Sequence, residues 1–348
     1  PGGYMIKTEV KNKVGIIYLD RQDALNALNC EMIGEIDKAL RDFEKDPAIK
    51  AILFDSKADR GLSAGGDLKE IYYDYIKNDK EKNKDEFFKK EFELNKYIMT
   101  YPKSIISHWY GVTMGGGIGL TIHSDLIIAD ESVNWAMPET SLGFVPDVSV
   151  GYYISKLPQA MGQLVGLTGA RLYPDDLIRF SLADLLIDSK DYQKILEKLF
   201  AFDTSSTDFI GDFSKEIESY AKKPGETENT QNMEKIEKYF GKDSLEEILK
   251  SLEANQEDDF AREKLEILKE RDPFMTQVQF EKYFYGKNLT REETIDLDLK
   301  IINHGLKTGE IEEGIRTVMI DREDRPSWPV KTFSDVDKNE VKNLLKIK

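Results

Sequence analysis

Cysteine and histidine are scarce in this chain of 348 residues, and their scarcity narrows the chemistry that the chain can perform. The one cysteine, Cys30, excludes an internal disulfide and a cysteine-rich metal site, and it fits a reducing compartment. The three histidines, His108, His123 and His304, include no pair with metal-binding spacing. We therefore expect no metal cofactor and a structural role for each histidine.

Basic residues are also in the minority, because 49 lysines and arginines stand against 65 aspartates and glutamates, for a net charge of −16. This excess repels nucleic acids and anionic membranes, so neither is an expected partner. A small anionic ligand stays compatible, since a few cations and oriented N–H groups reverse the sign locally. No apolar run reaches membrane-spanning length and no targeting segment is recognised, so we expect a soluble, cytoplasmic protein, with homo-oligomerisation left open.

Strand and helix patterns alternate in the first part of the chain, which indicates an α/β fold. Short apolar runs rich in β-branched residues predict strands at 14–20, 51–56, 104–112 and 125–130. After about residue 190 only charged amphipathic helices are expected, at 209–223, 243–253, 256–271 and 290–304. These patterns predict an α/β core over residues 5–200, and a helical C-terminal region over residues 201–348 that packs on the core.

Nucleotide-binding signatures are missing, but two other glycine-rich strings are present. The chain has no phosphate loop, and Leu120 stands where a dinucleotide fingerprint needs its last glycine. "SAGGD" (63–67) and "MGGG" (114–117) each follow a predicted strand and open a helical pattern. Such starts offer N–H groups without intrahelical partners, and two that converge form an oxyanion hole, each donor contributing roughly 100- to 1,000-fold in rate. Taken alone, each string is equally compatible with a tight turn.

These strings, with "GVTMGGGIGL" (111–120) and "AMPETSLGFVPD" (136–147), resemble the crotonase (enoyl-CoA hydratase/isomerase) superfamily and, within it, the 3-hydroxyisobutyryl-CoA hydrolases. "LDRQDALNAL" (19–28) and "EEGIRTVMIDREDRPSW" (312–328) are similar to the same subgroup, so the resemblance covers nearly the whole chain. It implies a spiral core of repeated β-β-α units, an acyl-CoA substrate, and no cofactor beyond the coenzyme A that the substrate carries.

The resemblance also implies the positions that bind the thioester. The oxyanion donors would be the N–H groups of Ala64 and Gly116. Further substrate-binding positions would be Gly65, Gly66, Asp67, Gly115 and Gly119. Candidates for the phosphates of coenzyme A, not distinguishable by sequence from ordinary surface residues, are Arg21, Lys57, Arg60 and Lys69.

Carboxylates distinguish the reactions of the family. Hydratases hold a water between two glutamates, but here Gly119 occupies the first position and only Glu139 remains, so hydration lacks its second acid/base. Asp147 stands where the hydrolase subgroup has an aspartate. The resemblance therefore implies thioester hydrolysis, with Glu139 as nucleophile or as base for water, and Asp147 bonding a 3-hydroxyl or orienting the water. Glu91 resembles a substrate-contacting glutamate of the subgroup.

Other interpretations of the same residues stay open. Glu139 is compatible with a surface turn, Asp147 with the N-cap of a helix, and Glu91 with one turn of a charged helix. Ser149 and Val150 stand where the subgroup often has glycines, which leaves the shape of the acyl pocket undefined. An enoyl-CoA isomerase that uses one glutamate and a non-catalytic acyl-CoA-binding protein remain the alternatives to a hydrolase of 3-hydroxyisobutyryl-CoA.

Overall fold

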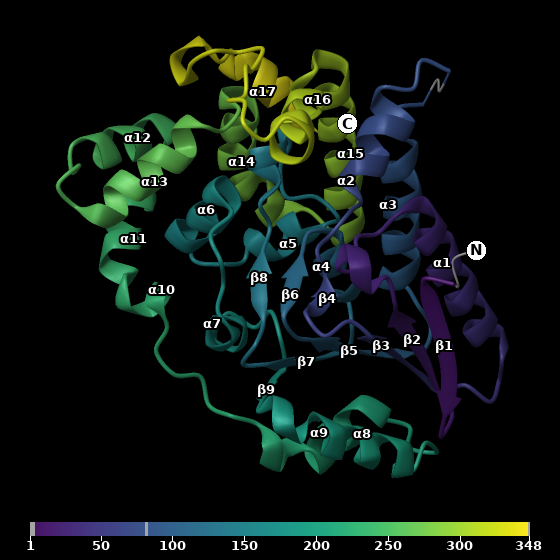
Figure 1. Ribbon diagram of the computed structural model, residues 1–348. Coiled ribbons are helices and arrows are strands. Elements are labelled where there is room, and N and C mark those ends of the chain that lie inside the picture. The colour runs from purple at the N-terminus through teal and green to yellow at the C-terminus, as the bar shows by residue number, and fades with distance from the viewer. Residues whose placement is uncertain (1–3, 81–82, 347–348) are drawn as a thin grey trace. The chain divides into compact units, whose positions relative to one another are not determined.

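The computed structural model describes residues 4–80 and 83–346 (Figure 1). Its chain forms two compact units, each built from three separated segments. Unit 1 comprises Pro1–Gly66, Glu93–Trp135 and Leu172–Thr227, and unit 2 comprises Asp67–Phe92, Ala136–Arg171 and Glu228–Lys348. The units therefore do not follow the expected boundary after residue 200. Residues 201–227, which follow that boundary, belong to unit 1, and two segments that precede it, Asp67–Phe92 and Ala136–Arg171, belong to unit 2.

Unit 1 is organised by a six-stranded sheet of order β1-β2-β3-β5-β7-β9. Its strands are β1 (Ile6–Lys11), β2 (Val14–Leu19), β3 (Ala51–Ser56), β5 (Ser104–Trp109), β7 (Leu126–Asp130) and β9 (Leu185–Ile187). Only β1 runs antiparallel to its neighbour, and the others form a parallel series (Figure 1). The parallel strands are buried along almost their whole length, as expected for a sheet covered on both faces.

A second sheet of three short strands carries the glycine-rich strings. Its order is β4 (Gly61–Ser63), β6 (Val112–Met114) and β8 (Asn134–Ala136). The helices of unit 1 are α1 (Cys30–Lys45), α4 (Gly116–Thr121), α7 (Pro174–Arg179), α8 (Tyr192–Ala201) and α9 (Phe209–Glu216). Helix α1 begins where the Asn29 side chain accepts a 2.8 Å hydrogen bond from the N–H of Met32, an N-cap of the usual kind.

Unit 2 is helical, and α3 (Glu86–Met99) runs from its first segment into unit 1. Its other helices are α2 (Leu68–Glu70), α5 (Val150–Ile154), α6 (Gln159–Thr168), α10 (Glu228–Gln231), α11 (Met233–Phe240), α12 (Leu245–Glu253), α13 (Asp259–Lys269), α14 (Pro273–Tyr285), α15 (Arg291–Thr308), α16 (Glu310–Ile315) and α17 (Lys338–Leu345). Helix α14 begins at Pro273 after an Asp272 N-cap and is buried on nearly all sides. No helix in the described residues is long and apolar enough to cross a membrane.

The alternation of strands and helices followed by helices alone confirms the α/β class. Four predicted strands are found as β2, β3, β5 and β7, and after β9 the described chain contains helices and no strand. Helix α14 was not predicted, because its apolar and polar residues are buried together, and it therefore lacks the one-sided periodicity by which amphipathic helices are recognised.

Candidate active site

The "SAGGD" loop of unit 1 is held by the segment that contains Leu25 and Asn26. Both residues have left-handed backbone conformations, with φ of 47° and 54°. The buried Asn26 amide donates to the carbonyl of Leu62 at 2.8 Å, and the Leu28 N–H donates to the carbonyl of Gly65 at 2.8 Å. The "LNAL" part of the N-terminal resemblance therefore fixes the course of the loop. The described contacts give residues 25–28 no direct role in the chemistry.

Ser63 lies in the string Gly-Leu-Ser-Ala-Gly, whose pattern matches a nucleophile elbow. Its side chain is fully buried, donates to the carbonyl of Asn26 at 2.8 Å and accepts from the N–H of Gly65 at 3.1 Å. A serine nucleophile must be exposed at the top of such a turn, so this hydroxyl supports the loop and does not act as a nucleophile.

The "MGGG" string turns from β6 into α4 at Gly115, whose φ of 50° and ψ of −124° suit glycine. A Cβ on Gly65 would lie 3.3 Å from the carbonyl oxygen of Met114 and 3.4 Å from the nitrogen of Gly116, so the two glycine loops are in contact. Gly117 has a packing role, because a Cβ there would lie 2.6 Å from the Cβ of Ser63.

The two predicted oxyanion donors differ in what they already bond. The Gly116 N–H is the first of α4 and has no acceptor among the described residues. The Ala64 N–H donates to the carbonyl of Leu25 at 2.9 Å, so an acyl oxygen would have to share that hydrogen. Gly66, the half-buried residue two positions on, also has an N–H without an acceptor in the described chain. Gly66 is among the substrate-binding positions predicted from the sequence, but it was not predicted as an oxyanion donor.

The other glycine of the string, Gly119, is buried within α4. Its N–H donates to the carbonyl of Gly115 at 3.1 Å and its own carbonyl accepts from the Asn95 side chain at 3.3 Å. Asn95 is 1% exposed, and its side-chain oxygen has no partner among the described residues. A polar, buried surrounding at Gly119 is compatible with a position that carries a glutamate in hydratases.

In unit 2, Glu139 opens the 3-10 turn Glu139–Leu142 directly after Pro138. The turn is held by the Thr140 hydroxyl, which donates to the carbonyl of Leu167 at 2.9 Å, and it ends at Gly143 with φ of 78°. Glu139 is only 4% exposed, and its Oε2 has no hydrogen-bond partner in the described chain. The surface-turn interpretation is therefore wrong, and the carboxyl has an oxygen free for a ligand.

Asp147 is likewise buried, and it does not cap a helix. Helix α5 begins at Val150 after Ser149, whose φ is 66° and whose side chain makes no capping bond. The N–H of Val150 donates to the carbonyl of Asp147 at 2.9 Å and not to its side chain. The N-cap interpretation is therefore wrong.

Glu91 on α3 is the third buried carboxyl of this set, with 4% exposure and an Oε2 that has no partner among the described residues. It is not on the charged, solvated face of the helix. Asp67, also a predicted substrate-binding residue, is the N-cap of the short helix α2, where its side chain accepts from the N–H of Glu70.

Burial and neighbouring charges raise the proton affinity of all three buried carboxyls. Burial first, and the neighbouring carboxyl of Asp147 second, hold the pKa of both Glu91 and Glu139 well above the usual range. Burial, followed by the charge of Asp298, raises the pKa of Asp147 to about 8, although the Lys282 ammonium opposes the shift. All three carboxyls therefore hold a proton to higher pH than exposed carboxyls do. Such a set is suited to proton transfer or to nucleophilic attack.

Among the lysines and arginines proposed for coenzyme A phosphates, two have other contacts. Arg21 donates through Nη1 to the carbonyl of Ala27 at 2.8 Å, and the Lys57 ammonium lies 3.8 Å from the centre of the Tyr18 ring. Lys57, Arg60 and Lys69 are exposed. None of these contacts selects one of them as a phosphate ligand.

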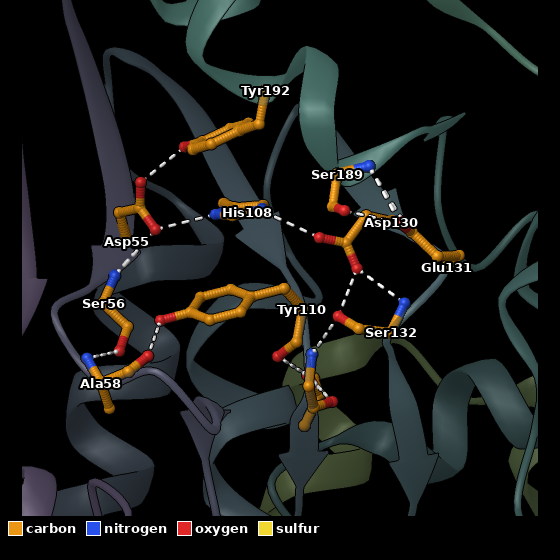
Figure 2. A network of polar contacts seen from close by, with 12 residues as sticks. Asp55, Ser56, Ala58, His108, Tyr110, Asp130, Glu131, Ser132, Ser189 and Tyr192 are labelled. Carbon is orange, nitrogen blue, oxygen red and sulfur yellow. Dashed lines mark hydrogen bonds and ion pairs between the residues drawn. The ribbon is translucent and has the colours of Figure 1, made fainter.

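A second polar cluster in unit 1 surrounds His108. Figure 2 shows His108 between Asp55 and Asp130, with the rings of Tyr110 and Tyr192 on either side. Its Nδ1 lies 2.8 Å from Asp55, its Nε2 lies 3.8 Å from Asp130, and the ring stacks on Tyr192 at 3.6 Å between centroids. Burial alone would lower the pKa of His108, but the two carboxylates outweigh it and raise the pKa. The structural role expected for this histidine is in keeping with a 6% exposed ring held between two carboxylates.

The parallel sheet, the glycine loops and the buried carboxyls are accompanied by a match to one known family. Residues 14–345 match the family described as enoyl-CoA hydratase/isomerase, so the chain belongs to that family.

Among its relatives are the mitochondrial 3-hydroxyisobutyryl-CoA hydrolases of two distant organisms. The protein of Homo sapiens is 29% identical over 340 residues, which cover 97% of this chain and 87% of the human one. That of Dictyostelium discoideum is 30% identical, with coverage of 97% and 90%.

Solved structures of the same family carry other activities in their titles. A carnitinyl-CoA dehydratase from Mycobacterium thermoresistibile matches with a TM-score of 0.87 at 26% identity, covering 99% of this chain and 97% of that one. An enoyl-CoA hydratase from Rhodobacter sphaeroides matches with a TM-score of 0.86 at 30% identity, covering 98% and 97%. These matches confirm the predicted crotonase fold.

Proposed function

We propose that this chain hydrolyses a β-hydroxyacyl-CoA thioester, with 3-hydroxyisobutyryl-CoA as the first candidate, to the free hydroxy acid and coenzyme A. The observation that carries the proposal is the pair of buried carboxyls at Glu139 and Asp147, combined with glycine at position 119. A hydratase of this family uses a second glutamate where this chain has Gly119. The hydrolase names of the full-length relatives support the same reaction.

In the proposed reaction the Gly116 N–H and a second donor of the "SAGGD" loop polarise the thioester carbonyl. The Glu139 carboxylate then attacks the carbonyl carbon, the C–S bond breaks, and the thiolate of coenzyme A leaves and takes up a proton. Water hydrolyses the resulting mixed anhydride and restores the carboxylate. In the alternative course, Glu139 takes a proton from the water that attacks directly.

Asp147 is proposed to recognise the 3-hydroxyl of the acyl group or to orient the attacking water. Its raised pKa means that near neutral pH the side chain is present in both the protonated, donating form and the ionised, accepting form. A buried polar group that lacks its partner is costly, so substrates without the hydroxyl should be turned over less well.

No metal or nucleotide enters this proposal, since carboxyls and N–H donors are sufficient for thioester hydrolysis. We also propose a cytoplasmic location on the basis of the single cysteine, which fits a reducing compartment. The named relatives are mitochondrial, so fractionation of the native source is the test of this point. Light scattering will measure whether the chain forms a homo-oligomer.

The deciding experiment follows two products in parallel on a panel of acyl-CoA esters. Purified protein without added metal or nucleotide is given 3-hydroxyisobutyryl-CoA, 3-hydroxypropionyl-CoA, isobutyryl-CoA and a 3-enoyl-CoA. Free thiol reports hydrolysis and absorbance of the conjugated product reports isomerisation. We expect thiol release, fastest on the two hydroxylated esters.

Glu139→Gln is expected to lower kcat at least about 1,000-fold, because an amide is neither nucleophile nor base. The exposed Glu197→Gln is the matched control for loss of one glutamate charge. Isomerisation without thiol release would favour the isomerase. Tight binding of the esters without any turnover would favour a non-catalytic acyl-CoA-binding protein.

A further inference from the structure

The loop that carries Asp147 has an unusual backbone. Val148 and Ser149 have φ of 50° and 66°, a region that side chains other than glycine rarely occupy and that is especially unfavourable for a β-branched residue. Two consecutive residues in this region cost on the order of 1–3 kcal/mol each. Some part of the surrounding structure must hold the loop in this form.

Contacts to α14 and α15 provide that hold. The Lys282 ammonium donates to the carbonyl of Pro146 at 2.9 Å, immediately before Asp147. On the other side of Asp147, the Ser149 N–H donates to the Asp298 carboxylate at 2.9 Å. The loop is therefore fixed at the residue before Asp147 and at the second residue after it.

Lys282 and Asp298 also bond to each other, with 2.5 Å between Nζ and Oδ1, and their side chains are 2% and 0% exposed. The fold makes room for the pair, since a Cβ on Gly151 would lie 2.8 Å from the Lys282 ammonium. A buried ion pair is weak evidence for stability, because an apolar pair of similar volume is often as stable or more stable. The placement of this one around Asp147 points to a role in positioning.

We propose that the buried Lys282–Asp298 ion pair is a positioning device for the proposed reaction, which clamps the 146–149 loop with Val148 and Ser149 in their left-handed conformation and so aims the Asp147 carboxyl. The clamp itself rests on the described contacts. Its expected effect on kcat rests in addition on the proposed function. Lys282 is in addition the cation that opposes the raised pKa of both Asp147 and Glu139. The helical region after residue 228 thereby contributes to the chemistry of its own unit.

The central variant is the double substitution Lys282→Met with Asp298→Leu, because it removes both partners of the ion pair together and leaves neither of them unpaired. We expect it to fold, with kcat on the hydroxylated esters lowered about 100-fold, the cost of a misplacement of about 1 Å, and with KM changed much less. Asp298→Glu keeps the charge and the acceptor, so it should restore a large part of kcat relative to Asp298→Asn.

The matched control is Gln279→Met, a substitution of another buried polar side chain on α14. Gln279 is 1% exposed, packs against Gly166 and makes no hydrogen bond to residues 146–149 in the described chain, so kcat should stay within about threefold of wild type. Amide hydrogen exchange of the peptide 146–151 gives a readout independent of turnover. The Ser149 N–H should lose its protection in the double variant and keep it in the control.

The outcomes separate the two proposals. If wild type releases thiol and the double variant matches Gln279→Met in both kcat and exchange, the clamp is refuted while the hydrolase assignment stands. If wild type releases no thiol from any ester, the hydrolase assignment is refuted and the pair loses its kinetic role. A double variant with a fully exchanging loop but wild-type kcat would also overturn the positioning role.

Discussion

Asp147→Asn is expected to make the protein more stable while it impairs turnover. The physical reason is that the carboxyl of the unfolded chain is ionised at working pH, so folding must either bury that charge or take up a proton, whereas an amide of the same shape has no charge to desolvate. In the folded protein burial and the Asp298 charge raise the pKa of Asp147 from the ordinary 3.8 to about 8. The folded state therefore binds this proton more tightly than the unfolded state does.

The sign and the size of the stability change follow from the difference in the pKa of Asp147 between the folded and the unfolded state. The stability that Asp147 contributes is complete below pH 3.8 and declines as the pH rises toward about 8. Within that window each pH unit lowers the free energy of unfolding of wild type, relative to Asp147→Asn, by at most about 1.4 kcal/mol. Between pH 5 and pH 7 the stability gap between variant and wild type should widen by up to about 3 kcal/mol.

Urea unfolding of wild type and Asp147→Asn at pH 5, 6 and 7 measures this gap directly. The exposed Asp74→Asn controls for the loss of a surface charge, and its gap to wild type should stay constant. The thiol-release assay should show Asp147→Asn impaired most on hydroxylated esters. A gap for Asp147→Asn that does not change with pH, or that narrows, would refute the argument that this carboxyl is held in an unfavourable site.

Two further substitutions test the glycine string and the histidine cluster. Gly119→Glu restores the carboxyl that hydratases carry, so we expect loss of thioester hydrolysis and a trace of crotonyl-CoA hydration; unchanged hydrolysis would mean that position 119 does not face the substrate. The raised pKa of His108 adds stability that is complete below the ordinary 6.5 and is lost as the pH rises through the folded value. The gap in unfolding free energy between wild type and His108→Gln should therefore be largest below pH 6.5 and shrink above it, and a gap that grows with pH in urea titrations would contradict the assignment.

The sequence was sufficient to predict the parts that depend on local pattern. The buried parallel strands are runs of β-branched residues with few other interpretations, and β2, β3, β5 and β7 were found within three residues of their expected ends. The same holds for the glycine strings, because a strand followed by small residues and a helix start is a local signal.

Features that depend on tertiary contacts could not be predicted. The Ala64 N–H donates to the carbonyl of Leu25, and Leu25 lies in a turn about forty residues earlier in the chain. That Glu139 and Asp147 are buried follows from the folding of unit 2 around them, whereas their sequence context equally suits a turn and a cap. Lys282 offered no signal at all, since a lysine on a helix is ordinarily solvated and nothing local indicates an aspartate sixteen residues further on as its partner.

The C-terminal helices thus have a larger part in the site than packing alone. A cluster of three buried carboxyls is unstable by itself, because the Asp147 carboxyl raises the proton affinity of both Glu91 and Glu139. Within unit 2 the cation that moderates this repulsion is Lys282 of α14, and the carboxylate that fixes both Lys282 and the Asp147 loop is Asp298 of α15. If the helices are needed to hold such a cluster ready for chemistry, then shortening the chain before α14 should abolish hydrolysis even where the sheet of unit 1 still forms.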